Sequence, residues 1–168
     1  MMNKDKRMRL SPEVKRINKL DKENLPWSLL LTAAPEKEKV QQYIDSGFGF
    51  TWQKGKETCG VIVVVTRENE FEIMNLAVAN ELQGTGIGLQ LLKYALKEIQ
   101  KKKTTQQEII VRTGSTSSVA LHLYKKVGFV ECARDKDYFL INYKELIYEN
   151  GNLLREQVTL KKQISHLL

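Results

Sequence analysis

Hydrophobic and polar positions along this chain follow two periods, one suited to strands and the other to helices. An unbroken apolar run at residues 59–66, rich in valine, predicts a buried strand. A short polar turn separates it from a second apolar stretch at residues 71–79, and the two together predict a β-hairpin. Residues 89–101 place apolar side chains three and four positions apart, which predicts an amphipathic helix. The middle of the chain is therefore expected to run from a hairpin into a helix.

Similar patterns extend over the rest of the chain. Strands are expected at residues 14–20, 48–53, 59–66, 71–79, 108–113, 130–141 and 155–160, and helices at residues 26–33, 35–46, 89–101 and 119–127. The last of these helices is expected to bury Val119, Leu123 and Val127, which recur four positions apart. The segment that begins at residue 153 also fits a helix. This order of elements favours the α/β (α+β) class, with a mixed sheet and helices on both of its faces.

Length and composition agree with one domain. The chain has 168 residues, 42% of them hydrophobic, which is enough for a sizeable core. No apolar run approaches the ~20 residues of a membrane span, and the charged N-terminal segment lacks the apolar centre of a signal peptide. Cys59 and Cys132 form no Cys-x-x-Cys pattern, and the two histidines are isolated. We therefore expect a cytoplasmic protein with reduced thiols, no metal site and no membrane partner.

The formal net charge of +7 is concentrated near the N-terminus. Residues 1–22 contain eight lysines and arginines but only three acidic residues. We expect residues 1–13 to form a basic tail and residues 14–168 to form the single domain. A basic end could touch nucleic acid, but no aromatic side chain is interleaved with these charges, so a solvated tail is the simpler interpretation.

A glycine-rich turn follows the predicted hairpin. Its sequence, Gln-Gly-Thr-Gly-Ile-Gly at residues 83–88, leads directly into a helix. Glycines let the backbone approach a ligand closely, and the start of a helix offers unpaired N–H groups, so the turn predicts a phosphate or pyrophosphate seat. The P-loop pattern fails because no Lys-Ser or Lys-Thr follows Gly88, and the spacing differs from the Gly-x-Gly-x-x-Gly of dinucleotide sites.

A second motif lies further along the chain. Residues 113–118, Thr-Gly-Ser-Thr-Ser-Ser, suit the start of a helix. That helix ends in the pattern Leu-Tyr-x-x-x-Gly-Phe, in which Gly128 suits the left-handed position that terminates a helix.

The two motifs, in this order and spacing, resemble the GNAT superfamily of acetyl-CoA-dependent N-acetyltransferases over roughly residues 25–165. The resemblance implies a mixed, mostly antiparallel sheet of about six to seven strands, splayed around acetyl-CoA. It also implies cofactor contacts from one strand, from the glycine turn and from the segment before the later helix. The residues at these positions are Leu76, Ala77, Val78, Gln83, Gly84, Thr85, Gly86, Ile87, Gly88, Leu89, Ser115 and Ser117. Related proteins carry Asn at position 115, so serine is a departure there.

The resemblance also implies two catalytic side chains. Tyr124 matches the tyrosine that can protonate the departing thiolate, although it could simply be a core tyrosine. Glu72 matches a glutamate that accepts the proton of the amine, and an ordinary salt bridge at the strand is its alternative role. Strand alternation predicts that Glu72, Met74, Leu76 and Val78 share one face.

The acceptor is expected to be a primary amine in a pocket built by residues 27–47 and by a late hairpin at residues 134–143. Glu70, Glu72, Asp135 and Asp137 could attract a cationic amine there. The sequence leaves open a small molecule or a protein as the acceptor, and a homodimer. It also leaves open a non-catalytic acyl-CoA-binding sensory module on the same fold.

Overall fold

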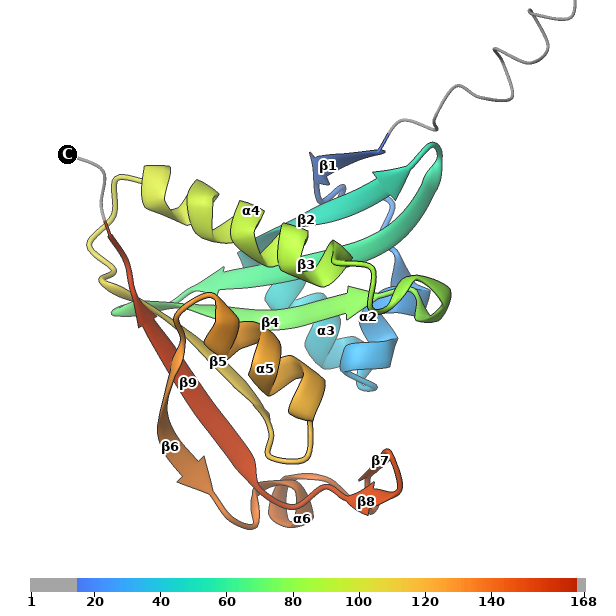
Figure 1. The fold of residues 1–168 in the computed structure, drawn as a ribbon, viewed down its shortest axis with the longest axis vertical. Helices are drawn as coiled ribbons and strands as arrows, with labels where there is room; N and C mark the ends of the chain where they lie inside the picture. Colours follow the sequence, from blue (N-terminus) through green and yellow to red (C-terminus); the bar gives the residue numbers. More distant parts are fainter. Residues whose placement is uncertain (1–14, 166–168) are drawn as a thin grey trace, which may run out of the picture.

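A computed structural model describes residues 15–165, which fold around one seven-stranded sheet with helices on both faces (Figure 1). The predicted basic tail at residues 1–13, and the boundary at residue 14, lie outside the described residues. Among residues 15–165, no helix is long and apolar enough to span a bilayer.

The sheet is mixed and mostly antiparallel, as predicted. Its spatial order is β1-β2-β3-β4-β5-β9-β6, and only the β4–β5 pair is parallel. The strands are β1 (Lys15–Lys19), β2 (Gly47–Lys54), β3 (Glu57–Thr66), β4 (Glu70–Val78), β5 (Glu108–Gly114), β6 (Val130–Asp135) and β9 (Gln157–Gln163). A separate two-stranded ribbon consists of β7 (Tyr148–Glu149) and β8 (Asn152–Leu153).

Helices cover the sheet in two layers that divide the core (Figure 1). The helices are α2 (Trp27–Ala33), α3 (Lys37–Ser46), α4 (Ile87–Lys101), α5 (Ser118–Lys126) and the short α6 (Tyr138–Asn142), with a 3₁₀ turn, η1, at Asn80–Leu82. One apolar cluster joins the sheet to α4 and α5, and a second joins its other face to α2 and α3. The valine-rich β3 supplies buried side chains to both, because its alternate residues point to opposite faces.

Two elements near the C-terminus differ from the predictions. The strand predicted at residues 130–141 ends at Asp135, and α6 follows, with the N–H groups of Leu140 and Ile141 donating to the carbonyl of Asp137. Residues 134–143 are therefore not a hairpin. The segment that also fitted a helix is instead β9, because pairing with β5 on one side and β6 on the other satisfies its backbone.

The buried face of α5 also differs from its prediction. Val119 is 81% exposed, whereas Tyr124 is buried and Leu123 and Val127 pack partly against the core. The four-residue spacing therefore predicted the buried face correctly at Leu123 and Val127 but not at Val119, in the first turn of the helix.

Candidate active site

A split in the sheet creates the space for the site. The parallel pairing of β4 with β5 covers only Glu70–Ile73 and Glu108–Val111, and beyond it the two strands diverge (Figure 1). From Met74 to Val78, β4 therefore has a strand partner on its β3 side alone. The N–H groups that β4 turns toward the gap remain available to a ligand, because no strand pairs with that edge.

The glycine turn lies at the far end of β4, where η1 leads into α4. Gly84 and Gly86 have φ values of 80° and 93°, in the left-handed region that favours glycine. A side chain added at either position would meet open space, so the turn presents bare backbone. The first N–H with an intrahelical partner is that of Gln90, which donates to Gly86, so the preceding N–H groups of α4 are available to an anion.

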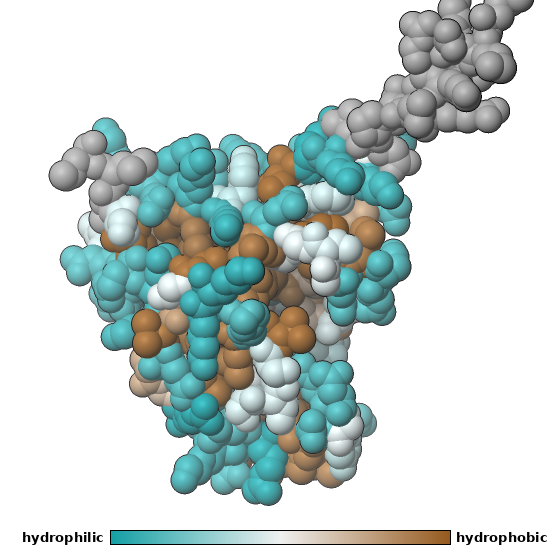
Figure 2. All heavy atoms as spheres, viewed as in Figure 1, coloured by the Kyte–Doolittle hydropathy of each residue, from teal (hydrophilic) through white to brown (hydrophobic). Residues whose placement is uncertain are grey.

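Apolar surface lines the approach from this turn to the gap. Leu76 and Val78 on β4, and Leu123 on α5, are half-buried members of the cluster on this face. A Cβ at Gly88 would lie 3.6 Å from Leu123 and 3.7 Å from Val78, so α4, α5 and β4 meet closely here. Figure 2 shows hydrophobic surface gathered between α4 and α5 on this side of the molecule. Such a lining suits the aliphatic arm of a cofactor.

Tyr124 lies on α5, which covers the diverging ends of β4 and β5 (Figure 1). Its side chain is buried and packs edge-on against Phe129, with 5.5 Å between the ring centroids. Burial raises the pKa of its hydroxyl well above the usual value. That hydroxyl has no hydrogen-bonding partner within residues 15–165, so its proton is available.

A β-bulge changes the faces of β4 and corrects one prediction. Val63 pairs with Asn75 and Val64 pairs with Ile73, which leaves Met74 as the extra residue. Leu76 and Val78 consequently face α4 and α5 together with Ile73. Glu72 faces the opposite side of the sheet, so the prediction that it shares a face with Val78 is wrong.

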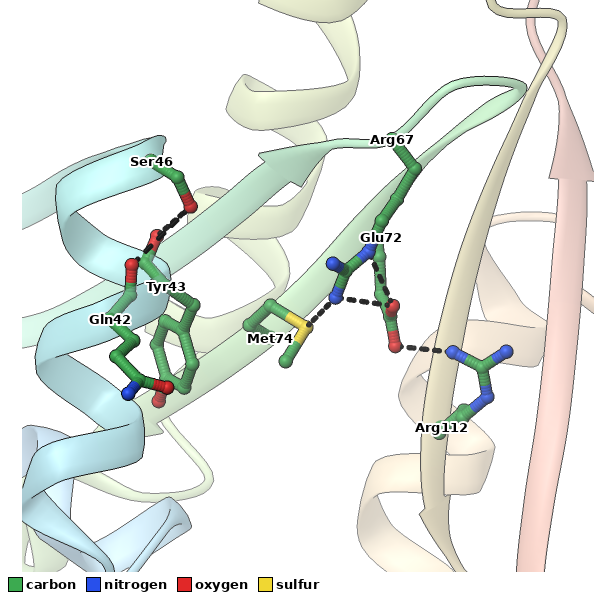
Figure 3. A network of polar contacts seen from close by, with 7 residues as sticks. All are labelled: Gln42, Tyr43, Ser46, Arg67, Glu72, Met74 and Arg112. Atoms are coloured by element: carbon green, nitrogen blue, oxygen red, sulfur yellow. Dashed lines mark hydrogen bonds and ion pairs between the residues drawn. The ribbon is translucent and has the colours of Figure 1, made fainter.

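Glu72 belongs to an ion cluster on the α2/α3 side (Figure 3). Its Oε1 accepts a hydrogen bond from Nε of Arg67 at 3.2 Å and lies 3.1 Å from Nη2 of the same arginine, and its Oε2 accepts a hydrogen bond from Nη1 of Arg112 at 2.6 Å. Nη2 of Arg67 also lies 3.7 Å from Sδ of Met74. Glu72 is therefore a buried carboxylate with two arginine partners, and it reaches across the junction between β4 and β5.

The arginines of this cluster are site residues that sequence reasoning missed. Arg112 was visible as the cation that follows the apolar run at residues 109–111, but the sequence does not show which strand lies beside it. Arg67 lay in the predicted turn, where the sequence alone gave it no partner.

The two predicted serine contacts lie before α5. The N–H of Ser115 donates to the carbonyl of Glu156, and the hydroxyl of Ser117 donates to Oε2 of Glu149 at 2.7 Å. Ser117 thus ties the start of α5 to β7, and its side chain caps no helix N–H.

A polar group is buried where β4 meets α2 and α3. The side-chain amide of Asn75 donates to the carbonyl of Leu30 and to the hydroxyl of Tyr43, each at 2.9 Å. Its Oδ1 atom is buried and has no partner. Burial raises the pKa of Tyr43, which keeps its hydroxyl protonated.

Aromatic rings from α6 and the following residues approach this same side. The rings of Phe139 and Tyr143 stack with centroids 5.6 Å apart, and Nζ of Lys39 on α3 lies 5.6 Å from the Tyr143 ring. Residues from the N-terminal and C-terminal halves of the chain thus meet on the α2/α3 side. We call the stacked rings of Phe139 and Tyr143 the aromatic wall.

Metal ligands do not cluster in the described part of the chain. Within residues 15–165, no group of three or more His, Cys, Asp or Glu side chains could hold a metal ion.

A cavity of about 520 Å³ lies between the first turns of α4 and the strands β1 and β2. Thr85 and Ile87 of the glycine turn line that cavity, whereas Tyr124 and Glu72 do not.

Known proteins share this chain's sequence and fold. The acetyltransferase (GNAT) domain model matches residues 28–139. The uncharacterized N-acetyltransferase YvbK of Bacillus subtilis is 41% identical over 135 residues, which cover 80% of this chain and 86% of that protein.

Two solved structures extend the comparison to the ligand. A GNAT family acetyltransferase from Elizabethkingia anophelis with acetyl-CoA bound is 33% identical, has a TM-score of 0.82 and is matched over 89% of this chain and 97% of its own. A Bacillus subtilis acetyltransferase in complex with CoA is 37% identical, has a TM-score of 0.80 and is matched over 90% and 100%. The chain therefore belongs to the GNAT family of acetyltransferases and is an acyltransferase.

Proposed function

We propose that this protein transfers the acetyl group of acetyl-CoA to a primary amine by direct attack. The observation that carries the proposal is the split between β4 and β5, which opens beside the glycine turn and is covered by the helix bearing Tyr124. The turn would bind the pyrophosphate, with contacts from Gln83, Gly84, Thr85, Gly86, Ile87, Gly88 and Leu89. The pantetheine arm would lie along Leu76, Ala77 and Val78, near Ser115 and Ser117.

The backbone of β4 would hold and polarise the thioester. An N–H directed at the carbonyl oxygen stabilises the negative charge that develops as the amine attacks the carbonyl carbon. The gap offers such groups because β4 is paired on one side only after Ile73. The new C–N bond forms as the C–S bond breaks, and CoA leaves as a thiolate.

Tyr124 would give its proton to that thiolate. A tyrosine hydroxyl is protonated at neutral pH, as a general acid requires. The absence of a competing partner within residues 15–165 leaves the O–H able to turn toward the sulfur.

Glu72 would take the proton lost by the amine, through a water molecule. A carboxylate has about four lone-pair sites, and Glu72 uses one on Oε1 for Nε of Arg67 and one on Oε2 for Nη1 of Arg112. The remaining site on Oε2 can accept a hydrogen bond from water.

The first test replaces Tyr124 by phenylalanine, which keeps the ring against Phe129 and removes only the hydroxyl. We expect amine-dependent release of CoA to fall by about 10- to 1,000-fold, in line with general-acid contributions. The acetyl-CoA dissociation constant should stay the same. Tyr94→Phe, on α4 against Phe50, is the matched control and should match the parent.

Unchanged turnover in Tyr124→Phe would make Tyr124 a packing residue only. If acetyl-CoA binds but no amine in a broad panel releases CoA, the chain would be a sensory module.

A further inference from the structure

We propose that the acceptor amine carries a carboxylate, which Arg112 and Arg67 bind beside Glu72. The inference rests on the proposed acetyl transfer and adds the chemical class of the acceptor. One consideration is which side of the sheet the acceptor uses. Because α5 closes the gap on the α4/α5 side, the amine must reach the thioester from the α2/α3 side, where the ion cluster lies.

The ion cluster has an excess of positive charge at its surface. Two guanidinium groups surround one carboxylate, which leaves a net charge of +1. The side chains of Arg67 and Arg112 are 45% and 41% exposed, whereas that of Glu72 is 8% exposed. An incoming ligand therefore meets the cations and not the carboxylate.

The arginines also have donors to spare. A guanidinium group carries five N–H bonds on three nitrogens. Arg112 uses Nη1 for Glu72, and Arg67 uses Nε and Nη2 for Glu72 and Met74. Nη2 and Nε of Arg112, and Nη1 of Arg67, have no partner within residues 15–165. A guanidinium edge with two unpaired nitrogens, as in Arg112, fits a carboxylate with two parallel hydrogen bonds.

Two of the four acidic residues expected to attract a cationic amine have arginine partners within the protein. Glu72 is held by two arginines, and Asp137 is 3.2 Å from Nη2 of Arg155. The aromatic wall already holds a cation of the protein itself, Lys39. A second ammonium at this side would be repelled, whereas a carboxylate would be attracted.

The position of the cluster sets the spacing between the two groups of the acceptor. Arg112 directly follows Val111, the last residue of β5 that pairs with β4, and so lies near the level of Met74. Because the pyrophosphate would lie at the glycine turn beyond Val78, the far end of the pantetheine arm would lie toward Leu76, two residues from Met74 along β4, which corresponds to about 7 Å. The amine and the carboxylate should therefore be separated by several methylene groups, as in an ω-amino acid.

The experiment compares matched pairs of acceptors in acetyl-CoA-dependent CoA release. The pairs are 4-aminobutanoate with 4-aminobutanamide and 6-aminohexanoate with 6-aminohexanamide, which differ in the carboxylate. Glycine and 1,4-diaminobutane complete the panel. We expect kcat/KM for each acid to exceed that for its amide by about 10- to 100-fold, the range of a charge-assisted bidentate contact.

The arginine variants use the acid-to-amide ratio as their readout, so that any effect on the shared chemistry cancels. Arg112→Gln should bring the acid-to-amide ratio close to one. Arg112→Lys should give an intermediate ratio, because lysine keeps the positive charge but cannot donate two parallel hydrogen bonds to a carboxylate. Arg16→Gln, which removes an exposed guanidinium on β1, should keep the parent ratio.

Two results would overturn the inference alone. One is an active protein that prefers the amides or 1,4-diaminobutane, or that acetylates an uncharged peptide N-terminus better than any acid. The other is a parent ratio that Arg112→Gln leaves unchanged. If acetyl-CoA binds and no amine is acetylated, the proposed function itself fails.

Discussion

The two ends of β4 build parts of the site in different ways. At the Val78 end, the site consists of backbone, in the unpaired strand edge, the left-handed glycines and the first turn of α4. At the Glu72 end, it consists of side chains from the β3–β4 turn, β4 and β5 that meet in an ion cluster (Figure 3). The bulge at Met74 separates the two ends and turns them to opposite faces of the sheet.

This difference explains why one end is so much easier to predict from sequence. A backbone site requires particular residues at fixed local spacing, because only glycine readily adopts φ near 90°. A side-chain cluster depends on which strands become neighbours and on which way each residue points. Glu72 and Arg112 are 40 residues apart and meet only through the parallel β4–β5 pairing.

The largest expected effect concerns the backbone end. Gly86→Glu places a carboxylate where the pyrophosphate is expected, so acetyl-CoA should no longer stabilise the protein. At 100 times its dissociation constant, acetyl-CoA should add about 2.7 kcal/mol to the free energy of unfolding of the parent. Thermal unfolding with and without acetyl-CoA measures this difference.

Gly55→Glu is the matched control, because Gly55 has a φ of 60° and open space around it in the β2–β3 turn. Both variants should suffer the backbone strain of about 1–2 kcal/mol for a left-handed residue, and only Gly86→Glu should lose the response to acetyl-CoA. A full response in Gly86→Glu would place the pyrophosphate elsewhere.

The next effect concerns the side-chain end. Glu72→Gln leaves two partly exposed guanidinium groups without their counter-charge, which should lower the free energy of unfolding by about 1 kcal/mol after allowance for solvent screening. It should also slow acetyl transfer at neutral pH by about 10- to 100-fold. High pH should partly restore the rate, because the amine then arrives already neutral.

Rate–pH profiles from pH 6 to 9.5 separate the possible roles of Glu72. A base role predicts a steeper rise with pH in Glu72→Gln than in the parent, whereas a purely positioning role predicts a raised KM at every pH. Glu68→Gln, in the exposed turn before the same strand, should follow the parent profile. Parallel profiles for Glu72→Gln and the parent would exclude the base role.

The smallest effect separates structure from binding at Ser117. Ser117→Ala removes the hydrogen bond to Glu149 and should lower the free energy of unfolding by about 1 kcal/mol. If the hydroxyl serves only this tie, the acetyl-CoA dissociation constant should not change. Ser118→Ala, on the next and exposed residue, is the control. Weaker acetyl-CoA binding by Ser117→Ala alone would support the predicted cofactor contact.

Much of the fold was predictable because its elements have strong local signals. The valine-rich β3, the hairpin to β4 and the amphipathic α4 were predicted close to their observed bounds. The β7–β8 ribbon was missed, although its turn, Asn150-Gly151, carries the positive φ values of 50° and 79° typical of tight hairpins.

The remaining differences depend on tertiary context. A bulge adds one residue to one strand without a change in composition, so alternation along β4 could not show that Glu72 and Val78 face opposite ways. The apolar run at residues 138–141 suits a strand as well as a helix, and in the structure the chain turns at Asp137 and the N–H of Phe139 donates to the carbonyl of Arg155. The buried partners of Asn75 likewise come from two helices distant in sequence.

The short parallel pairing between Glu70–Ile73 and Glu108–Val111 has a mechanical consequence. Within residues 15–165 it is the only strand pairing between the half of the sheet made of β1–β4 and the half made of β5, β9 and β6. These two halves are joined by four residue pairs. Glu72 lies on β4 and Arg112 on β5, so their ion pair links the two halves of the sheet through side chains as well. A molecule that draws Arg112 away from Glu72 would remove this link, which would couple the separation of β4 and β5, where the acetyl donor is expected, to what binds at the arginines.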